Sequence, residues 1–388
     1  MDFAIPEDLR IMQETVRRFV EKDLEPISRQ VEEEYRIPEE VVDTMRELGL
    51  FGLSTPQQYG GLGLSTLGEV LVYEELAKTN AAFRTRISTS NGIVTLGIVI
   101  DGTEEQKRTY LPRIASGQWT SAFALTEPEA GSDAANIKTD AKLDGDHWAL
   151  NGRKHFITNG DIADLITVMA VTDKEKAARG GITAFLVEKH YPGFSVGSVD
   201  KKLGFRGSNT CELIFDNCIV PKENVIGGDA MIGQGFKTAM RILDKGRLTI
   251  GAAAVGASQK LLDLCVEYAN QRVQFGKTLG QFQMIQAMLA DMATEIYAAR
   301  QMLYHAAWLR DQGRNTTREA SMVKLFSSEM GCRIADRAVQ IFGGMGYMEE
   351  MPIQMYFRDL RLYRIFEGTS EIQRIVIARD LLKRHEKA

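Results

Sequence analysis

Residues that build metal centres and disulfide frameworks are scarce in this sequence. Its 388 residues include four cysteines and five histidines. No CxxC pair exists, and no histidine stands four residues from another or in a ligand-like motif with a carboxylate. We therefore expect no metal site and no disulfide framework, and a reduced intracellular setting fits best.

Long apolar runs and an excess of basic residues are also lacking. No apolar stretch approaches the roughly 18–20 residues that a membrane span needs. The net charge is −5, from 47 basic and 52 acidic residues, so nothing favours a nucleic-acid partner. The N-terminal segment MDFAIPEDLR has neither the basic nor the apolar region of a signal peptide. We expect a bacterial cytoplasmic protein, or a mitochondrial matrix protein if a transit peptide has been removed.

The sequence does contain three regions of different periodicity. Residues 1–120 and residues 232–388 have apolar residues at three- and four-residue spacing, which predicts helices. Between them, residues 121–231 carry short β-branched and aromatic runs separated by turns, which is typical of antiparallel strands. We predict an α+β fold of helices, then a β domain, then a helical bundle. One stripe is expected to lie in the bundle core: Ile285, Met288, Leu289, Met292 and Ile296.

A glycine cluster at 340–350, QIFGGMGYMEE, has the composition of a dinucleotide-binding loop. It follows a helical stretch, whereas a Rossmann loop follows a strand. We therefore exclude a Rossmann fold here. The glycines still allow backbone to approach the phosphates or adenine of a cofactor.

The segment LYRIFEGTSEIQR at 362–374 is the best candidate for chemistry. Glu367 follows Ile365 and Phe366, and apolar surroundings raise the pKa of a carboxyl group and make it a better base near neutrality. Thr369 and Ser370 are suited to cap the helix that follows. Composition alone leaves open that Glu367 is a surface residue at a helix entry.

Several motifs together resemble the acyl-CoA dehydrogenase family along essentially the whole chain. They are LTEPEAGSD (125–133), GRKHFITNG (152–160), RVQFGKTLGQFQ (272–283), QIFGGMGY (340–347) and FEGTSEIQR (366–374). The resemblance implies an N-terminal helical domain, a central antiparallel β-barrel-like domain and a C-terminal four-helix bundle. It also implies a homotetramer, a dimer of dimers, with FAD at a subunit interface and electron-transferring flavoprotein as the electron acceptor.

The resemblance assigns Glu367 as the base that removes the α proton of an acyl-CoA while the β carbon passes a hydride to flavin N5. The backbone N–H of this glutamate and an FAD hydroxyl are expected to bind the thioester oxygen. Some relatives place the base just before the arginine of the segment LDKGRL, where this chain has Gly246.

Cofactor contacts are also implied by the resemblance. Along the flavin they are Phe123, Leu125, Thr126, Phe156 and Thr158, and Thr369 and Glu371 also match cofactor-contacting positions. From the neighbouring subunit they are Arg272, Gln274, Phe275, Gln340 and Gly344. Most relatives have Trp where this chain has Phe156, a departure that we expect to alter flavin packing without abolishing binding.

For the substrate, the resemblance implies that Ser132 contacts pantetheine, that Asp244 and Arg247 make polar contacts, and that Gly368 allows close ligand approach. The segment AAFRTRISTSNG (81–92) matches the acyl-pocket helix, where Arg84, Ser90 and Asn91 are expected to meet the acyl group. In glutaryl-CoA dehydrogenases an arginine matching Arg84 binds the distal carboxylate. Alternatively, Arg84 and Arg86 pair with acidic residues outside the helix.

The acyl group stays open between short linear, branched, dicarboxylic and alicyclic chains. An acyl-CoA oxidase is less favoured, because oxidases of this fold usually carry a further C-terminal domain and the sequence ends shortly after Glu367. The remaining alternative is a non-catalytic family member that acts as an assembly protein, although such a protein would not need its base.

Overall fold

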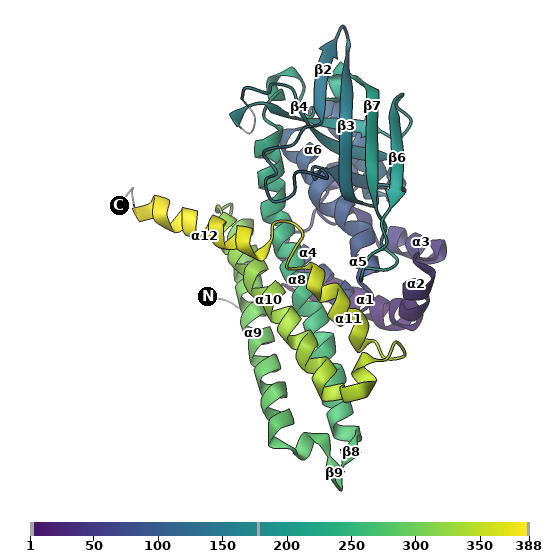
Figure 1. Cartoon of the computed structure of the whole chain (residues 1–388), viewed down its shortest axis with the longest axis vertical. Coiled ribbons are helices and arrows are strands. Elements are labelled where there is room, and N and C mark those ends of the chain that lie inside the picture. Colours follow the sequence, from purple (N-terminus) through teal and green to yellow (C-terminus); the bar gives the residue numbers. More distant parts are fainter. Residues whose placement is uncertain (1–3, 177–178, 386–388) are drawn as a thin grey trace.

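The protein consists of a β domain set between two helical parts. The computed structural model describes residues 4–176 and 179–385. Figure 1 shows the sheet at one end of the molecule and the long helices of the bundle extending towards the other end. The predicted order of helices, β domain and helical bundle is confirmed. The N-terminal helices are α1 (Glu7–Phe19), α2 (Ser28–Glu34), α3 (Glu39–Glu47), α4 (Thr66–Leu76), α5 (Ala81–Ser88), α6 (Thr95–Asp101) and α7 (Glu104–Ala115).

The β domain is one seven-stranded sheet with the order β1-β4-β2-β3-β7-β6, in which β5 also pairs with β4. Pairing is mainly antiparallel, as expected, but β4 pairs in parallel with β1 and, at one residue pair, with β2. β4 is buried along its whole length, because α6 and α7 contribute to the apolar cluster on one face. The strands are β1 (Ser121–Ala124), β2 (Asp140–Asp144), β3 (His147–Thr158), β4 (Leu165–Val171), β5 (Ile182–Glu188), β6 (Phe194–Val199) and β7 (Thr210–Pro221).

Three long helices, α8, α9 and α10, pack against one another, and the shorter α11 packs on α10 and α8. The predicted core stripe lies on α9: Met292 and Ile296 are buried, and its other members pack against the same core. A short hairpin of β8 and β9 joins α8 to α9 at the end of the bundle remote from the sheet (Figure 1). The bounds are α8 (Gly235–Gln271), β8 (Val273–Gln274), β9 (Lys277–Thr278), α9 (Gln283–Asp311), α10 (Thr317–Phe342), α11 (Ile353–Leu362) and α12 (Ser370–His385).

The N-terminal helices and the bundle share one apolar core, and α4 lies within it. Every residue of α4 except Leu67 is buried. A helix that is buried all round needs no polar face, yet α4 carries Glu69, Glu74 and Glu75. Across the two described ranges, no helix is both long enough and apolar enough to cross a bilayer.

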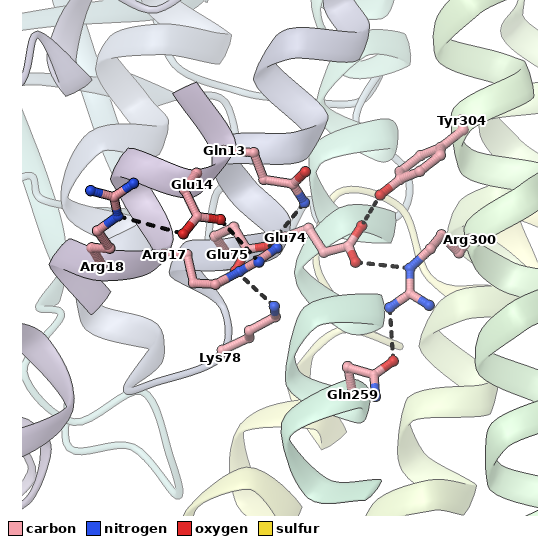
Figure 2. Close-up of polar contacts among 10 residues, drawn as sticks. All are labelled: Gln13, Glu14, Arg17, Arg18, Glu74, Glu75, Lys78, Gln259, Arg300 and Tyr304. Carbon is pink, nitrogen blue, oxygen red and sulfur yellow. Dashed lines mark hydrogen bonds and ion pairs between the residues drawn. The ribbon is translucent and has the colours of Figure 1, made fainter. Parts of the chain in front are cut away.

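The buried carboxylates of α4 connect it to its neighbours (Figure 2). Glu74 accepts hydrogen bonds from Arg300 Nε at 2.9 Å and from Tyr304 OH at 2.8 Å, both on α9. Glu75 points towards α1 and accepts from Arg17 Nη2 at 3.1 Å. Burial alone would raise the pKa of Glu75, but the hydrogen bonds and charges of Arg17 and Lys78 outweigh it and lower that pKa. Glu75 is therefore ionised, and the contacts of Glu74 and Glu75 together hold α1, α4 and α9 in register.

The contact between α4 and α8 depends on a glycine and gives a first prediction. A Cβ added at Gly256 would lie 2.0 Å from the carbonyl oxygen of Glu74, which is backbone and cannot move aside. We expect Gly256→Ala to separate the helices and lower the free energy of unfolding by about 1–3 kcal/mol. Thermal unfolding measures this, with Gly92→Ala as control, because an added Cβ at Gly92 meets nothing within 4 Å. Equal melting temperatures for the two variants would contradict the prediction.

Candidate active site

Glu367 lies in the loop between α11 and α12 and adopts a left-handed conformation, with φ of 52°, followed by Gly368 with φ of 89°. The residue is partly exposed, but its Oε2 atom is enclosed and has no hydrogen-bond partner among the described residues. On the facing helix α8, a Cβ at Gly246 would lie 2.2 Å from Oε2. Gly246 therefore makes the space that the carboxylate occupies.

Three cations surround this carboxylate from three different helices. Arg84 on α5, Lys324 on α10 and Arg247 on α8 are 2%, 0% and 5% exposed. Burial raises the pKa of Glu367, and the positive charges of these three residues oppose the rise. The result is a carboxyl group that is more basic than an exposed glutamate and still able to ionise.

The loop around Glu367 is held by side chains from both neighbouring helices. Lys324 Nζ donates to the Gly368 carbonyl at 2.7 Å, and Gln373 Nε2 donates to the same oxygen at 2.9 Å. The predicted cap is confirmed for Thr369, whose Oγ1 accepts from Ile372 N at 3.3 Å at the start of α12. Ser370 is instead the first residue of α12.

The residues expected on the flavin side meet where β1 ends and β3 passes. His155 N donates to the Thr126 carbonyl at 2.9 Å, which aligns the two segments. Phe156 is left-handed with φ of 58° and is 61% exposed, stacked on His155. An exposed aromatic ring beside the partly buried Thr126 and Thr158 suits a planar aromatic ligand. Phe123 and Leu125 lie at the same end of β1; Phe123 is partly buried and Leu125 is buried.

The residues expected to serve a neighbouring subunit lie at the far end of the bundle. A cavity of about 610 Å³ is lined by Arg272, Gln274 and Gly344 together with apolar residues of α8 and α10. Gln340 is exposed on α10 nearby, and Phe275 at the hairpin tip is 94% exposed. The guanidinium group of Arg272 and the amide group of Gln274, next to the backbone of Gly344, suit a phosphate-bearing ligand. The hairpin lies away from the β domain in the same chain (Figure 1).

On the substrate side, Asp244 and Arg247 pair on α8, with Arg247 Nη1 to Asp244 Oδ1 at 2.6 Å. Ser132 is exposed on the loop after β1, and Glu371 is exposed on α12. Ser90 is fully buried, its Oγ has no partner within the described chain, and its contact with the acyl group stays a prediction.

Asn91 is buried and bound mainly by backbone. Its Nδ2 donates to the carbonyls of Leu50 and Ile87, at 2.6 Å and 3.1 Å, and its Oδ1 accepts from Leu53 N at 2.6 Å. Both amide donors are thus taken by backbone carbonyls. Asn91 ties α5 and η5 (Thr89–Val94) to the 50–53 turn, and its contact with the acyl group stays a prediction.

Two lysines lie near the predicted residues but were not predicted from the sequence. Lys324 is fully buried beside Glu367, and its signal was a lysine inside an apolar helical stripe, SMVKLF. Lys154 is fully buried under the flavin-side loops, with Nζ 2.7 Å from Glu127 Oε1 and 3.1 Å from the Leu125 carbonyl. Within residues 4–176 and 179–385, no three His, Cys, Asp or Glu side chains gather to hold a metal ion.

The chain is similar to known proteins along nearly its whole length. The sequence families described as acyl-CoA dehydrogenase N-terminal, middle and C-terminal domains match residues 6–118, 122–218 and 233–382. The acryloyl-CoA reductase (NADH) of Anaerotignum propionicum is 42% identical over 386 residues, covering 99% of this chain and 97% of that protein.

Two solved structures are similar over nearly the whole chain. Butyryl-CoA dehydrogenase from Megasphaera elsdenii is 40% identical, with a TM-score of 0.95, and covers 98% of this chain and 100% of its own. A glutaryl-coenzyme A dehydrogenase in complex with glutaryl-CoA is 38% identical, with a TM-score of 0.93, and covers 99% and 97%.

The buried lysine under the flavin-side loops gives a second prediction. Burial lowers the pKa of Lys154 to about 8, and Glu127 opposes this. In Lys154→Met, Glu127 loses its counter-charge and the Leu125 carbonyl loses its donor, at a cost of about 3–5 kcal/mol locally. We expect the purified variant to carry much less FAD than the wild type, measured from the visible flavin band. Lys142→Met, at an exposed position on β2, is the control, and full flavin content in both variants would refute the prediction.

Proposed function

Because this chain belongs to the acyl-CoA dehydrogenase family, we propose that it desaturates the α,β carbons of an acyl-CoA thioester with Glu367 as the base. Members of the family are flavin-dependent oxidoreductases that act on CH–CH groups, and FAD is the cofactor. The observation that carries the proposal is the position of Glu367, an unpartnered carboxylate oxygen enclosed beside three cations.

The α proton of a thioester is weakly acidic, so its removal needs a base that is ionised and poorly solvated. Glu367 meets both requirements, because burial raises its pKa while Arg84, Lys324 and Arg247 keep the ionised form accessible. Its left-handed backbone turns its N–H away from the path of a helix, and we assign this N–H to bind the thioester oxygen. When bound, FAD supplies the acceptor for the β-hydride. The flavin-side and neighbour-side residues described above would hold it.

Removing the base gives a third prediction. We expect Glu367→Gln to retain FAD and acyl-CoA binding while the rate of flavin bleaching by acyl-CoA falls by about 100-fold or more. The wild-type rate should decline as the pH falls through the raised pKa of Glu367, because the protonated carboxyl cannot accept the α proton. An anaerobic titration across pH with both proteins checks this. Substantial turnover by the variant would show that another group acts as the base.

The charges around Glu367 support an acyl group that carries a distal carboxylate. Asp244 compensates Arg247, which leaves Arg84 and Lys324 facing the single negative charge of Glu367. Arg84 has no carboxylate partner in the described part of the chain; it lies over the Tyr363 ring at 5.7 Å, and its Nε is buried without a hydrogen bond. A guanidinium group in this state is suited to bind a carboxylate.

A short unsubstituted acyl group is the second candidate. It is supported by the similarity to a butyryl-CoA dehydrogenase. An alicyclic acyl group stays a prediction from the sequence. The assembly-protein alternative is less well supported, because the base and its surrounding charges are all present in this chain.

Substitution of the two neighbouring arginines gives a fourth prediction. If Arg84 binds the distal carboxylate, Arg84→Met should raise KM for glutaryl-CoA about tenfold or more and leave KM for butyryl-CoA unchanged. Loss of its charge beside Glu367 should slow both substrates alike, so KM is the parameter that tells them apart. Arg86→Met is the matched control, because Arg86 lies over Phe51 at 5.2 Å and makes no ion pair in the described residues. Equal changes in KM for the two substrates in Arg84→Met would reject the carboxylate contact and favour the short-chain candidate.

The partners follow from the same proposal. We propose a homotetramer, a dimer of dimers, in which Arg272, Gln274 and Phe275 complete the cofactor site of a neighbour, supported by their exposure beside the cavity. Electron-transferring flavoprotein is proposed as the electron acceptor. The bacterial sources of the relatives support the bacterial cytoplasmic location over the mitochondrial one.

A further inference from the structure

The loop that carries Glu367 is strained, and something must hold it. Glu367 and Gly368 are consecutive left-handed residues, with φ of 52° and 89°. A non-glycine residue in this region is uncommon and strained. Such a conformation persists only where neighbouring groups fix it, so the groups that bind its backbone matter for the direction of the carboxylate.

Two side chains bind this backbone, and they differ in charge. Gln373 Nε2 on α12 and Lys324 Nζ on α10 both donate to the Gly368 carbonyl, at 2.9 Å and 2.7 Å. Gln373 also donates to the Glu367 carbonyl at 3.3 Å. Both side chains are fully buried. Gln373 is neutral, whereas Lys324 brings a charge to the base.

Lys324 has no ion-pair partner among the described residues, although it is a buried lysine. Within residues 4–176 and 179–385, its one hydrogen bond is to the Gly368 carbonyl. Burial lowers the pKa of Lys324 to about 8, and the charge of Glu367 opposes that decrease. A buried ammonium group without a carboxylate in contact is costly, which suggests that its charge serves the nearby Glu367.

We infer that Lys324 is a positioning residue for the dehydrogenation: it fixes the Glu367–Gly368 turn through the Gly368 carbonyl and favours the ionised form of Glu367. This inference rests on the proposed role of Glu367 as the base. The amino group does not touch the carboxylate through any hydrogen bond or ion pair of the structure, so it acts through the loop and through its field.

Other charged groups face the same region and must be considered in any pH dependence. Asp244 pairs with Arg247, and Glu329 pairs with Arg364 at 2.8 Å. Glu371 is exposed, so solvent screens it. The full set that faces Lys324 or Glu367 is Tyr73 from α4, Arg84 from α5, Asp244 and Arg247 from α8, Glu329 from α10, and Glu371 from α12. Among the cations, Arg84 and Lys324 are the two without a carboxylate in contact within the described chain.

The test compares Lys324→Met with Gln373→Met. Each variant removes one donor to the same carbonyl, but only Lys324→Met removes a charge. We expect both to slow flavin bleaching by acyl-CoA, by about tenfold to 100-fold, because the carboxylate is misdirected. Only Lys324→Met should also move the acidic limb of the pH–rate profile to higher pH, since loss of a nearby cation makes Glu367 harder to ionise.

The measurement is the rate of anaerobic flavin bleaching across pH, with the acyl-CoA that bleaches the wild type fastest. If the acidic limb of the pH–rate profile lies at the same pH in Lys324→Met as in the wild type, that result would overturn the inference. So would an equal displacement in Gln373→Met, because the lysine would then act only as a structural donor. Lys324→Gln keeps a neutral hydrogen-bond donor and replaces Lys324→Met in the test if the methionine variant does not fold. It should also move the acidic limb of the pH–rate profile to higher pH.

Failure of this inference can be told apart from failure of the proposed function. If none of the acyl-CoA thioesters bleaches the flavin of the wild type, or if Glu367→Gln retains full turnover, the proposed function of Glu367 is wrong. This conclusion holds whatever the Lys324 variants show. If Glu367→Gln is inactive and the Lys324 variants keep the wild-type acidic limb, only the role of Lys324 is rejected.

Discussion

The Oε2 atom of Glu367 is enclosed, and the helices around it keep this carboxyl group able to ionise. Burial alone would neutralise a carboxylate. The charges of Arg84 on α5, Arg247 on α8 and Lys324 on α10 oppose this, and each comes from a different part of the chain. Gly246 leaves the space that the carboxylate fills, because any Cβ there would meet Oε2. Glu367 therefore has these surroundings only when the N-terminal helices and the bundle are packed together.

That packing depends on α4, whose buried carboxylates fix the positions of the helices that reach Glu367. Glu69 pairs with Lys245 Nζ at 2.6 Å, one residue before Gly246 on α8, and Glu74 binds α9 through Arg300. Buried ion pairs contribute little net stability compared with apolar packing, but removal of one partner is costly. They therefore penalise any shift of α8 along α4. A shift of this kind would also displace Gly246 from Oε2, so the register of the core and the geometry of the base are coupled.

The sequence predicted the features that depend on local pattern. The changes in periodicity gave the order of helices, sheet and bundle, and the residues TS before EIQR gave the cap of α12 at Thr369. The apolar neighbours of Glu367 in the sequence correctly predicted that its pKa is raised, but they are not the main cause. Ile365 is half exposed, and the helices that enclose the Glu367 carboxyl group are α5, α8 and α10. Asn91 and Lys324 could not be assigned, because their partners lie 38 and 44 residues away in the chain. Packing between distant segments decides such roles.

Arg84 and Arg86 illustrate the same limit and a consequence for specificity. Two residues apart on a helix, they point to nearly opposite sides, and only the structure shows that Arg84 faces Glu367 while Arg86 faces Phe51. Arg84 lowers the pKa of Glu367 as long as its charge is uncompensated. A carboxylate bound to Arg84 would compensate that charge and raise the pKa of Glu367. Under the proposed function, a dicarboxylic acyl group bound by Arg84 on α5 would therefore make Glu367 on the α11–α12 loop more basic.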